Sequence, residues 1–507
     1  MTTEELTGTV LALDGKKKLP KALVGGKAHS LNRMSALGMP VPPAFTITMN
    51  VCPVYHRLGQ TLPETVWQEV LDHLSGLERA VGRGFGSAGL PLLVSVRSGA
   101  ARSMPGMMDT VLNLGLTEPL RDVLAAETGD AHWAADTWER FRRSYTAIVG
   151  VLPSQNPHEQ LRAAIGAVFK SWFSERAMAY RDRHGIKDLL GTAVTVQAMV
   201  FGNRDDRSGT GVVFSRNPVS GEPGLFGEWL SKAQGEDVVS GERTPLPAAV
   251  LAKEQPENYR LLTELAVKLE ADAREMVDIE FTIESGRLYL LQARVGKRSA
   301  RAAARIAVDM VAEGLITEVT ALDRITVDQA RQLTKESVIA HDPVALSHGI
   351  AATPGIGSGI AVTDTDEAMQ LAAQGKSVVL VRPSTSPADV PAMFTATAVV
   401  TEQGGTTSHA ALVCRELDLP CVVGCGEGAS GQLAGRHITV DGNTGRIHLG
   451  GIRPSMPQGT LADGGTVIET LTAWAAKQDG GRTPEPRSLT ELLAMRDRLR
   501  AVGNGSM

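Results

Sequence analysis

One of the eleven histidines, His409, follows a glycine turn and precedes an apolar run typical of a helix. The segment 404–415 reads GGTTSHAALVCR, so His409 is expected in the first turn of that helix, with Thr407 or Ser408 as its N-cap. Free backbone N–H groups at a helix start favour phosphate, and a neutral imidazole is nucleophilic near physiological pH. The segment therefore indicates a histidine that could accept a phosphoryl group. For a lone histidine, a structural or merely exposed role is the more common explanation.

Two carboxylates alternate along a second stretch, 277–283. Its sequence VDIEFTI has the period of a strand, so Asp278 and Glu280 are expected on the same face. Carboxylate oxygens bind Mg²⁺ that bridges nucleotide phosphates, and such a face would suit that chemistry. From the alternation alone, the solvated face of an amphipathic hairpin is the simpler explanation.

A return strand follows this stretch after a glycine turn. If the loop has three residues, 285–287, Gln292 lies opposite Glu280. Arg294 then lies opposite Asp278. Two acids and two donors would converge on one face, where the arginine could neutralise phosphate charge.

Arg97 lies at the end of another strand pattern, 91–96, and begins a loop of small residues that runs to Asp109. An arginine beside the backbone donors of such a loop is a reasonable cradle for a phosphate. An ordinary surface turn would explain the same residues.

The composition is that of a globular protein. The chain has 507 residues, 43% of them hydrophobic and 21% charged, with a formal net charge of −5. This length suits two to four domains. Because the chain has no long Lys/Arg block, we expect neither nucleic acid nor a membrane surface as a partner. The polar N-terminus and the lack of a long apolar run favour a cytoplasmic protein.

The chain has four cysteines, Cys52, Cys414, Cys421 and Cys425. They are too few for a disulfide framework and fit a reducing compartment. The last three could be imagined as metal ligands, but they lack a paired C-x2-C spacing. We therefore expect no metal cluster there.

Strands, glycine turns and helices alternate along the chain, which favours a multidomain α/β and α+β fold. We expect four parts: a nucleotide-binding domain at 1–300, a helical linker at 301–345, a small α/β domain at 346–452 and a short helical tail at 453–507. Helices are expected at 63–81, within 130–184, and at 299–314, 326–333, 468–477 and 489–502. Strands are expected at 91–96, 193–201, 211–214, within 277–294, and at 378–381, 398–401, 420–423 and 437–440.

Several segments in sequence order resemble the ATP-grasp domain of pyruvate phosphate dikinases. They are 194–203 (VTVQAMVFGN), 208–211 (SGTG), 215–218 (SRNP), 221–222 (GE) and 233–239 (AQGEDVV). The stretches 103–116, 278–281 (DIEF) and 292–294 match the same family, and Gly25-Gly26-Lys27 resembles its first nucleotide-contacting segment. This combination is highly specific, and the resemblance implies an ATP-grasp fold.

The segment around His409 resembles the phosphohistidine signature of the swivelling domain shared by pyruvate phosphate dikinase, phosphoenolpyruvate synthase and related enzymes. The stretches 353–355, 420–424 and 441–445 match that domain too. The resemblance implies that ATP phosphorylates His409. It also aligns Thr407 with a threonine that a regulatory kinase modifies in some dikinases, although a capping role explains Thr407 equally well.

The resemblance implies roles for individual residues. His409 and Arg97 are the catalytic candidates. The ATP-binding candidates are Lys27, Arg97, Gln234, Asp278, Glu280, Gln292 and Arg294. The candidate ligands of Mg²⁺ are Asp278, Glu280 and Gln292, and a monovalent cation is a further expected cofactor. The β-phosphoryl group would go to histidine and the terminal phosphate to inorganic phosphate, leaving AMP and pyrophosphate. Water is the alternative second acceptor.

The resemblance covers nearly all of 20–450, whereas the family continues into a large (β/α)8 barrel that binds pyruvate or phosphoenolpyruvate. Only about fifty residues remain here, far fewer than such a barrel needs. The first hypothesis is a phosphohistidine half-enzyme that passes its phosphoryl group to pyruvate or an analogue on a separate barrel protein. The second is a compact kinase with direct transfer to a small molecule, as in rifampin phosphotransferases. The third is a non-catalytic nucleotide-binding regulator, which would not need both carboxylates, the arginines and the histidine.

Overall fold

The computed structural model describes residues 8–504 except 88, 103, 105–107, 184, 187–190, 236, 238–244, 335–344, 453–463 and 479–487. The chain divides into two compact units. One comprises Met1–Gly209 with Glu280–Ala293, and the other comprises Thr210–Ile279 with Arg294–Met507. The end of the predicted helical linker, at 335–344, and the stretches 453–463 and 479–487 of the predicted tail lie outside the described residues.

The first unit contains a five-stranded sheet in the order β1-β2-β5-β3-β4, in which every neighbouring pair is antiparallel. Its strands are β1 (Val10–Ala12), β2 (Ala44–Ile47), β3 (Val94–Gly99), β4 (Thr110–Leu114) and β5 (Ala193–Ala198). Its helices are α1 (Lys21–Ala36), α2 (Val51–Arg57), α3 (Glu64–Val81), α4 (Glu118–Thr128), α5 (Ala131–Val149), α6 (Pro157–Ser171) and α7 (Glu175–Arg183). The helices predicted at 63–81 and within 130–184 are confirmed.

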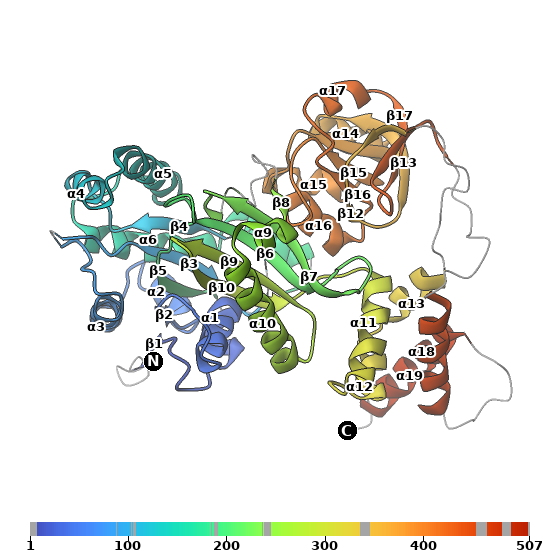
Figure 1. The fold of residues 1–507 in the computed structure, drawn as a ribbon, viewed down its shortest axis with the longest axis horizontal. Helices are drawn as coiled ribbons and strands as arrows, with labels where there is room; N and C mark the ends of the chain where they lie inside the picture. The colour runs from blue at the N-terminus through green and yellow to red at the C-terminus, as the bar shows by residue number, and fades with distance from the viewer. Residues whose placement is uncertain are drawn as a thin grey trace. The chain divides into compact units, whose positions relative to one another are not determined.

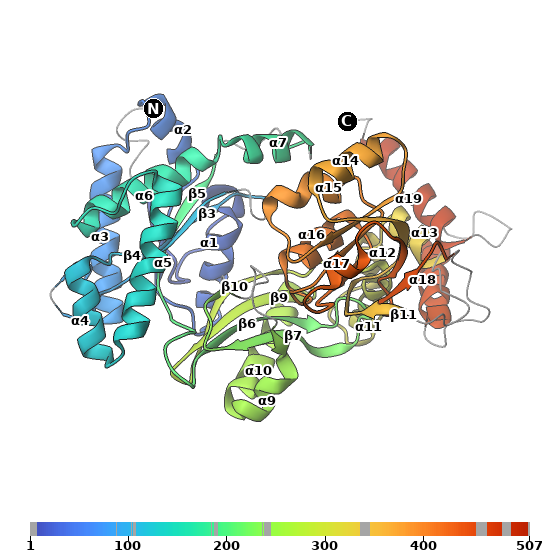
Figure 2. The same ribbon diagram turned by 90° about the horizontal axis from the view of Figure 1, so that it is seen from above.

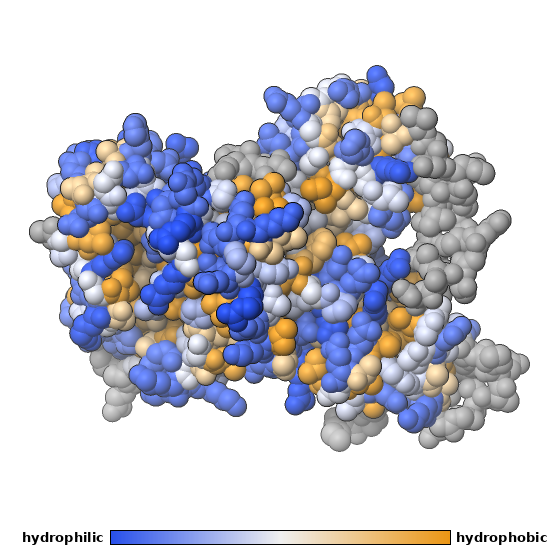
Figure 3. Space-filling view, in the orientation of Figure 1, coloured by the Kyte–Doolittle hydropathy of each residue, from blue (hydrophilic) through white to orange (hydrophobic). Residues whose placement is uncertain are grey.

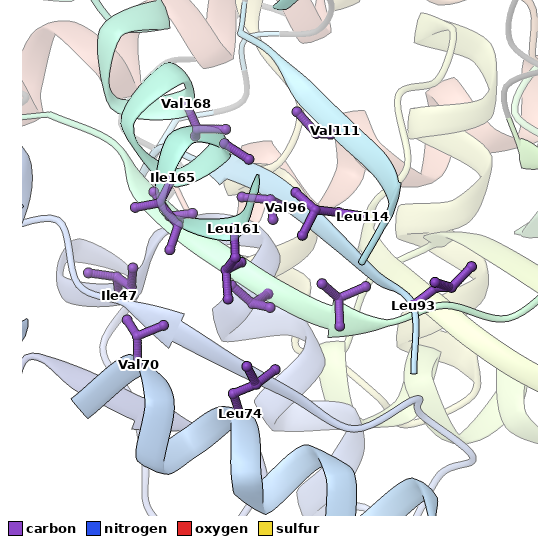
Figure 4. Close-up of a cluster of buried hydrophobic side chains, with 14 of the residues drawn as sticks. Ile47, Val70, Leu74, Leu93, Val96, Val111, Leu114, Leu161, Ile165 and Val168 are labelled. Atoms are coloured by element: carbon purple, nitrogen blue, oxygen red, sulfur yellow. The ribbon is translucent and has the colours of Figure 1, made fainter. Parts of the chain in front are cut away.

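One face of this sheet carries the main hydrophobic core, into which α3 and α6 pack (Figure 4). Val94 and Val96 of β3 are both fully buried in this core. Because successive side chains of a strand point to opposite faces, Ser95 and Arg97 lie on the other face. The core therefore fixes which way Arg97 faces.

The second unit contains most of another five-stranded sheet, in the order β10-β9-β6-β7-β8. Its strands are β6 (Gly209–Arg216), β7 (Pro223–Ser231), β8 (Leu246–Pro247), β9 (Val277–Glu284) and β10 (Arg287–Val295), and the division between the units passes through three of them. After β8 come the 3-10 turn η2 (Ala248–Val250) and the helices α9 (Leu251–Glu254) and α10 (Pro256–Ala273). Arg216 of β6 is 3% exposed and donates hydrogen bonds to Glu270 of α10, so an ion pair joins this strand to that helix.

The loop between β9 and β10 differs from the prediction. It has two residues, Ser285 and Gly286, rather than three, and both have positive φ, of 50° and 82°. Two-residue hairpins favour this backbone because its twist matches that of the strands. Ser285 tolerates it because its N–H donates to Ser208 Oγ at 2.9 Å and its hydroxyl donates to Asp205. We had derived the pairing of residues across β9 and β10 from a three-residue loop, and that loop length is wrong.

A separate eight-stranded sheet in the second unit has the order β11-β18-β17-β13-β14-β15-β16-β12. Its strands are β11 (Ala345–His348), β12 (Ile350–Thr353), β13 (Ile356–Val362), β14 (Val378–Arg382), β15 (Ala398–Thr401), β16 (Cys421–Val423), β17 (His437–Asp441) and β18 (Arg446–Leu449). The four strands β13 to β16 run parallel, and the others pair antiparallel. The accompanying helices are α14 (Thr365–Ala373), the turn η3 (Pro387–Asp389), α15 (Val390–Met393), α16 (His409–Leu417) and α17 (Ala429–Leu433).

This eight-stranded sheet curls back on itself. Its two edge strands, β11 and β12, follow one another in the chain with only Gly349 between them. Because one residue spans only about 3.8 Å between Cα atoms, the two edges must come together. Val378 and Leu380 pack in one apolar cluster with α14, α15 and α16, while Val379 and Val381 pack in a second on the other face. Burial on both faces explains why β14 is apolar without alternation.

Five helices form a third group in the second unit, as Figures 1 and 2 show: α11 (Ala300–Ala312), α12 (Glu318–Asp323), α13 (Val327–Thr334), α18 (Gly464–Gln478) and α19 (Leu489–Asn504). The first three precede the eight-stranded sheet in the chain and the last two follow it. Leu471 of α18 and Leu493 of α19 are buried against the alanines of α11 and α13. The two C-terminal helices that the sequence predicted are confirmed and belong to this packed group.

On the face drawn in Figure 3, hydrophobic residues are scattered among hydrophilic ones. A search of the described helices for one both long and apolar enough to cross a bilayer found none.

Candidate functional site

His409 is the first residue of α16, as the sequence predicted. Of the two predicted caps, Ser408 is the one used: its Oγ accepts a hydrogen bond from the N–H of Ala411. The hydroxyl of Thr385 lies 3.1 Å from Nδ1 of the His409 ring. The other ring nitrogen, Nε2, is buried and has no hydrogen-bond partner among the described groups. The arrangement therefore fixes the ring and leaves Nε2 available for a reaction.

The sheet topology explains how Thr385 reaches His409. Strands β14 and β15 are parallel neighbours, with Arg382 beside Thr401 in the register. Parallel strands end at the same edge of a sheet, so the segments that follow them, 383–386 and 402–408, lie together. Backbone hydrogen bonds confirm this, because the N–H of Gln403 donates to the carbonyl of Pro383 at 3.0 Å.

A buried carboxylate organises the Thr385 segment. Asp389 is 3% exposed, and it accepts hydrogen bonds from the N–H and hydroxyl of Ser386 in a capping box. Arg382 Nε lies 3.0 Å from the same carboxyl group. The residue next to Thr385 is thus held at both its backbone and its side chain, which restricts where the Thr385 hydroxyl can be.

Burial lowers the pKa of His409 below its ordinary value, and the negative charge of Asp389 offsets this in part. The neutral imidazole therefore persists to lower pH than that of an exposed histidine. Only the neutral ring has a lone pair with which to attack phosphorus.

In the first unit, the structure brings together two segments that only the family resemblance had connected, Gly25–Lys27 and the end of β3. The N–H of Gly26 donates to the carbonyl of Ala100 at 2.9 Å. Gly25 has a φ of 78°, and a Cβ there would lie 2.1 Å from the carbonyl oxygen of Gly99. This close approach needs glycine. Lys27, one residue further in α1, is therefore beside the end of the strand that carries Arg97.

Arg97 is half-buried, and its Nε is a buried atom with no hydrogen-bond partner among the described groups. A buried guanidinium nitrogen is normally satisfied, so an anion would complete this site. Of the loop predicted between Arg97 and Asp109, residues 103 and 105–107 lie outside the described part of the chain.

In the second unit, Arg294 Nε donates to Asp278 Oδ2 at 2.8 Å. Asp278 is 3% exposed, whereas Arg294 is about one-third exposed. Gln234 is 4% exposed and lies beyond β7, where its N–H donates to Asp237. The predicted convergence of Asp278 and Arg294 is therefore present.

Glu280 and Gln292 belong to the first unit, on β9 and β10. Glu280 is half-buried and Gln292 is 9% exposed. One residue separates Asp278 from Glu280 on one continuous strand, so alternation still places both carboxylates on the same face. The donor types fit a hard cation such as Mg²⁺, which prefers oxygen ligands.

Cys414 and Cys421 are buried within an apolar cluster, and Cys425 is half-buried. All four cysteines are free thiols. Among the described residues, no three His, Cys, Asp or Glu side chains gather in a group that could hold a metal ion.

Sequence reasoning missed two residues beside the His409 loop. Thr385 is distant in sequence and becomes a neighbour only through the order of parallel strands. Glu228 of β7 is 4% exposed and accepts hydrogen bonds from the backbone and hydroxyl groups of Thr406 and Thr407. An acid within the apolar stretch LFGEWL was a signal for a buried partner, because a buried carboxylate needs one.

Two protein families match the chain. Residues 56–257 match the family described as pyruvate phosphate dikinase, AMP/ATP-binding domain, and residues 374–445 match PEP-utilising enzyme, mobile domain. The second match contains Thr385 and His409.

Curated relatives align over most of the chain. A pyruvate, phosphate dikinase of Clostridium symbiosum is 39% identical over 521 aligned positions, which cover 90% of this chain and 59% of the relative. A pyruvate, phosphate dikinase of Rhizobium meliloti is 40% identical, with 86% and 56% covered. Pyruvate, phosphate dikinase 2 of Zea mays is 39% identical, with 90% and 58% covered. The chain thus spans a little over half the length of these relatives.

Proposed function

This chain belongs to the pyruvate phosphate dikinase family, and on that premise we propose that it transfers a phosphoryl group from ATP to Nε2 of its own His409. The observation that carries the proposal is the state of the His409 ring. Nδ1 is engaged by Thr385, the ring sits at a helix N-terminus, and burial favours the neutral form. In the reactive tautomer, the Nδ1–H donates to Thr385 Oγ1, which leaves the lone pair on Nε2.

The proposed reaction has two steps. The Nε2 lone pair first attacks the β-phosphorus and forms a P–N bond, while the bond from the β-phosphorus to the oxygen that leaves with AMP breaks, so that His409 carries the β- and γ-phosphates. An oxygen of inorganic phosphate then attacks the γ-phosphorus, and the bond between the β- and γ-phosphates breaks with its electrons on an oxygen of the β-phosphoryl group. The terminal phosphate goes to inorganic phosphate, giving pyrophosphate, as the name pyruvate, phosphate dikinase of the relatives suggests. Water in place of phosphate is the nearer alternative. The N–H groups at the start of α16 would stabilise the anionic phosphohistidine.

The nucleotide would be bound by the residues that the sequence indicated. Lys27 and Arg97 would contact phosphates, supported by their adjoining segments and by the buried Nε of Arg97. Arg294 would neutralise phosphate charge beside Asp278. Gln234 and Gln292 complete the proposed ATP-binding set.

Asp278, Glu280 and Gln292 would hold Mg²⁺, which when bound neutralises charge on the transferring phosphates. A monovalent cation remains a further proposed cofactor. We also propose the four-part division of the chain, with the phosphohistidine domain at 346–452. In addition, we propose that this domain moves between the ATP site and the acceptor. His409 must leave the ATP site before it can transfer its phosphoryl group to the acceptor.

We propose pyruvate or an analogue as the final acceptor, with phosphoenolpyruvate as the product, bound on a separate barrel protein. The described residues contain no (β/α)8 barrel that would bind it. A cytoplasmic location is part of the same proposal and is motivated by four free thiols.

The position of the label in ATP tests this proposal. With ATP labelled at the β-phosphate and with Mg²⁺ and phosphate present, we expect about one acid-labile phosphoryl group per chain, on the peptide that contains His409. ATP labelled at the γ-phosphate should label pyrophosphate and leave the protein unlabelled.

AMP release should stop near one turnover until an acceptor protein is added. Label from the γ-position on the protein would contradict the dikinase reaction, and sustained conversion of pyruvate by the chain alone would contradict the need for a partner.

The pH dependence of labelling should reflect the burial of His409. Because burial lowers the pKa, the rate should fall only below about 6.5, the ordinary histidine value, as the ring gains a proton. Thr385→Val should lower the plateau of this profile about tenfold, since the ring loses its hydrogen bond, while the acid limb stays in place. Single-turnover labelling from pH 5 to 8 measures both, with Thr395→Val as the control. An unchanged plateau would remove Thr385 from the site.

A further inference from the structure

We infer that Glu228 is a positioning residue for the phosphorylation of His409: its carboxylate holds the turn before His409 against the sheet that contains Asp278. The inference rests on the proposed function, because it concerns how His409 comes to meet ATP. Glu228 itself lies in β7 and the turn comprises residues 404–408, so the contact joins two segments far apart in sequence.

All four hydrogen bonds of this contact end on the two carboxylate oxygens. Oε1 accepts from the N–H of Thr406 and from its hydroxyl, the latter at 2.9 Å. Oε2 accepts from the N–H of Thr407, at 3.1 Å, and from its hydroxyl. Each oxygen thus receives two donors from one residue, which defines both the position and the orientation of the turn.

The contact is buried, which makes it selective. Glu228 and Thr406 are each 4% exposed, and Thr407 is fully buried. Removing a carboxylate from water is costly unless its oxygens are hydrogen-bonded, and here both are. If the turn were displaced, the buried carboxylate of Glu228 would lose its hydrogen-bond donors. The contact therefore strongly favours one position of the turn on β7.

Gly405 shows how closely the carboxylate of Glu228 approaches the turn. Its φ is not in the left-handed region, so the backbone conformation alone does not require glycine. A Cβ at this position would, however, lie 2.0 Å from Oε1 of Glu228. A side chain at this position would therefore displace the carboxylate from its place beside Thr406.

Both sides of the contact are held rigidly. The carbonyl of Thr406 accepts a hydrogen bond from Arg415 of α16, so the turn is fixed to the helix that begins with His409. On the other side, the indole of Trp229 is fully buried and donates to Glu254 at 2.9 Å. A shift of Glu228 would therefore be transmitted to the start of α16.

The test compares nucleotide binding with the rate of His409 phosphorylation in the full chain. Glu228→Ala should lower the single-turnover rate of labelling from β-labelled ATP about 100-fold, and Glu228→Gln about tenfold, because an amide can accept at only one atom. The dissociation constant of AMP, measured by calorimetry, should stay within about twofold. Glu264→Gln, an exposed acid of α10, is the control and should label normally.

A double-mutant cycle separates positioning from general loss of structure. Thr406→Val removes one hydroxyl and should slow labelling several-fold in the wild-type background, but it should add little to Glu228→Ala. Fully additive losses, or wild-type labelling by Glu228→Gln, would overturn the inference. A loss of AMP affinity that matches the loss of rate would overturn it too. If the wild-type chain takes no label, the proposed function itself fails; if wild type is labelled and Glu228→Ala is equally so, only this inference fails.

Discussion

Replacing His409 with alanine should abolish labelling of the protein by β-labelled ATP, by a factor on the order of 10³ or more. The expected loss is this large because the side chain supplies the atom that forms the new bond, and no neighbouring group replaces a nucleophile. The overall fold should be retained, since His409 is only half-buried and begins a helix whose cap is the preceding serine. AMP binding should persist, because the fold that forms the nucleotide site is retained.

The measurement is acid-labile radioactivity per chain, followed by peptide mapping. His348→Gln serves as the matched control, because His348 lies on the edge strand β11 of the same sheet and is exposed. Control labelling should equal that of the wild type. Label that persists in His409→Ala would show that another residue accepts the phosphoryl group, and the proposed site would then be wrong.

Glu280→Gln should reduce labelling by about 10²–10⁴-fold, because a proposed Mg²⁺ ligand loses its charge while keeping its shape. A bound metal ion contributes several kcal/mol of charge stabilisation in phosphoryl transfer, which corresponds to this range. The concentration of Mg²⁺ needed for half-maximal labelling should also rise. The thermal unfolding midpoint should change little, since Glu280 is half-buried on a strand.

Glu284 supplies the control for this substitution. It is on the same strand and, four residues later, on the same face, and it is half-buried too. Glu284→Gln should leave the Mg²⁺ requirement unchanged. If Glu280→Gln also labels normally with an unchanged Mg²⁺ requirement, the face that carries Asp278 and Glu280 is only the solvated side of a hairpin.

The sequence was informative where the chemistry is local. The helix start at His409 follows from one glycine turn, one cap and one apolar run, and the structure confirms it. The predicted meeting of Asp278 and Arg294 is also present, as an ion pair, although it was derived from a three-residue loop. The three-residue loop was wrong, because Ser285 adopts a backbone conformation that is unfavourable for most side chains and is held there by Asp205 and Ser208.

The sequence was less informative where the neighbours are set by tertiary structure. Thr385 meets His409 because β14 and β15 are parallel and adjacent, and strand order is not encoded in local periodicity. Glu228 meets Thr406 through a contact between strand β7 and a turn. The local traces of that contact were the acid within the apolar stretch LFGEWL and Gly405, but a glycine in a turn is ordinarily explained by its backbone conformation.

The five packed helices have a practical consequence for the integrity of the polypeptide. Helices α11 to α13 and helices α18 and α19 bury their apolar faces against one another, although the segment with His409 lies between them in the chain. Cleavage of the chain between α13 and β11 should therefore leave two fragments that remain associated, because the helices of the two fragments share one hydrophobic core. We therefore expect the protein to assemble from two separately expressed fragments divided between α13 and β11.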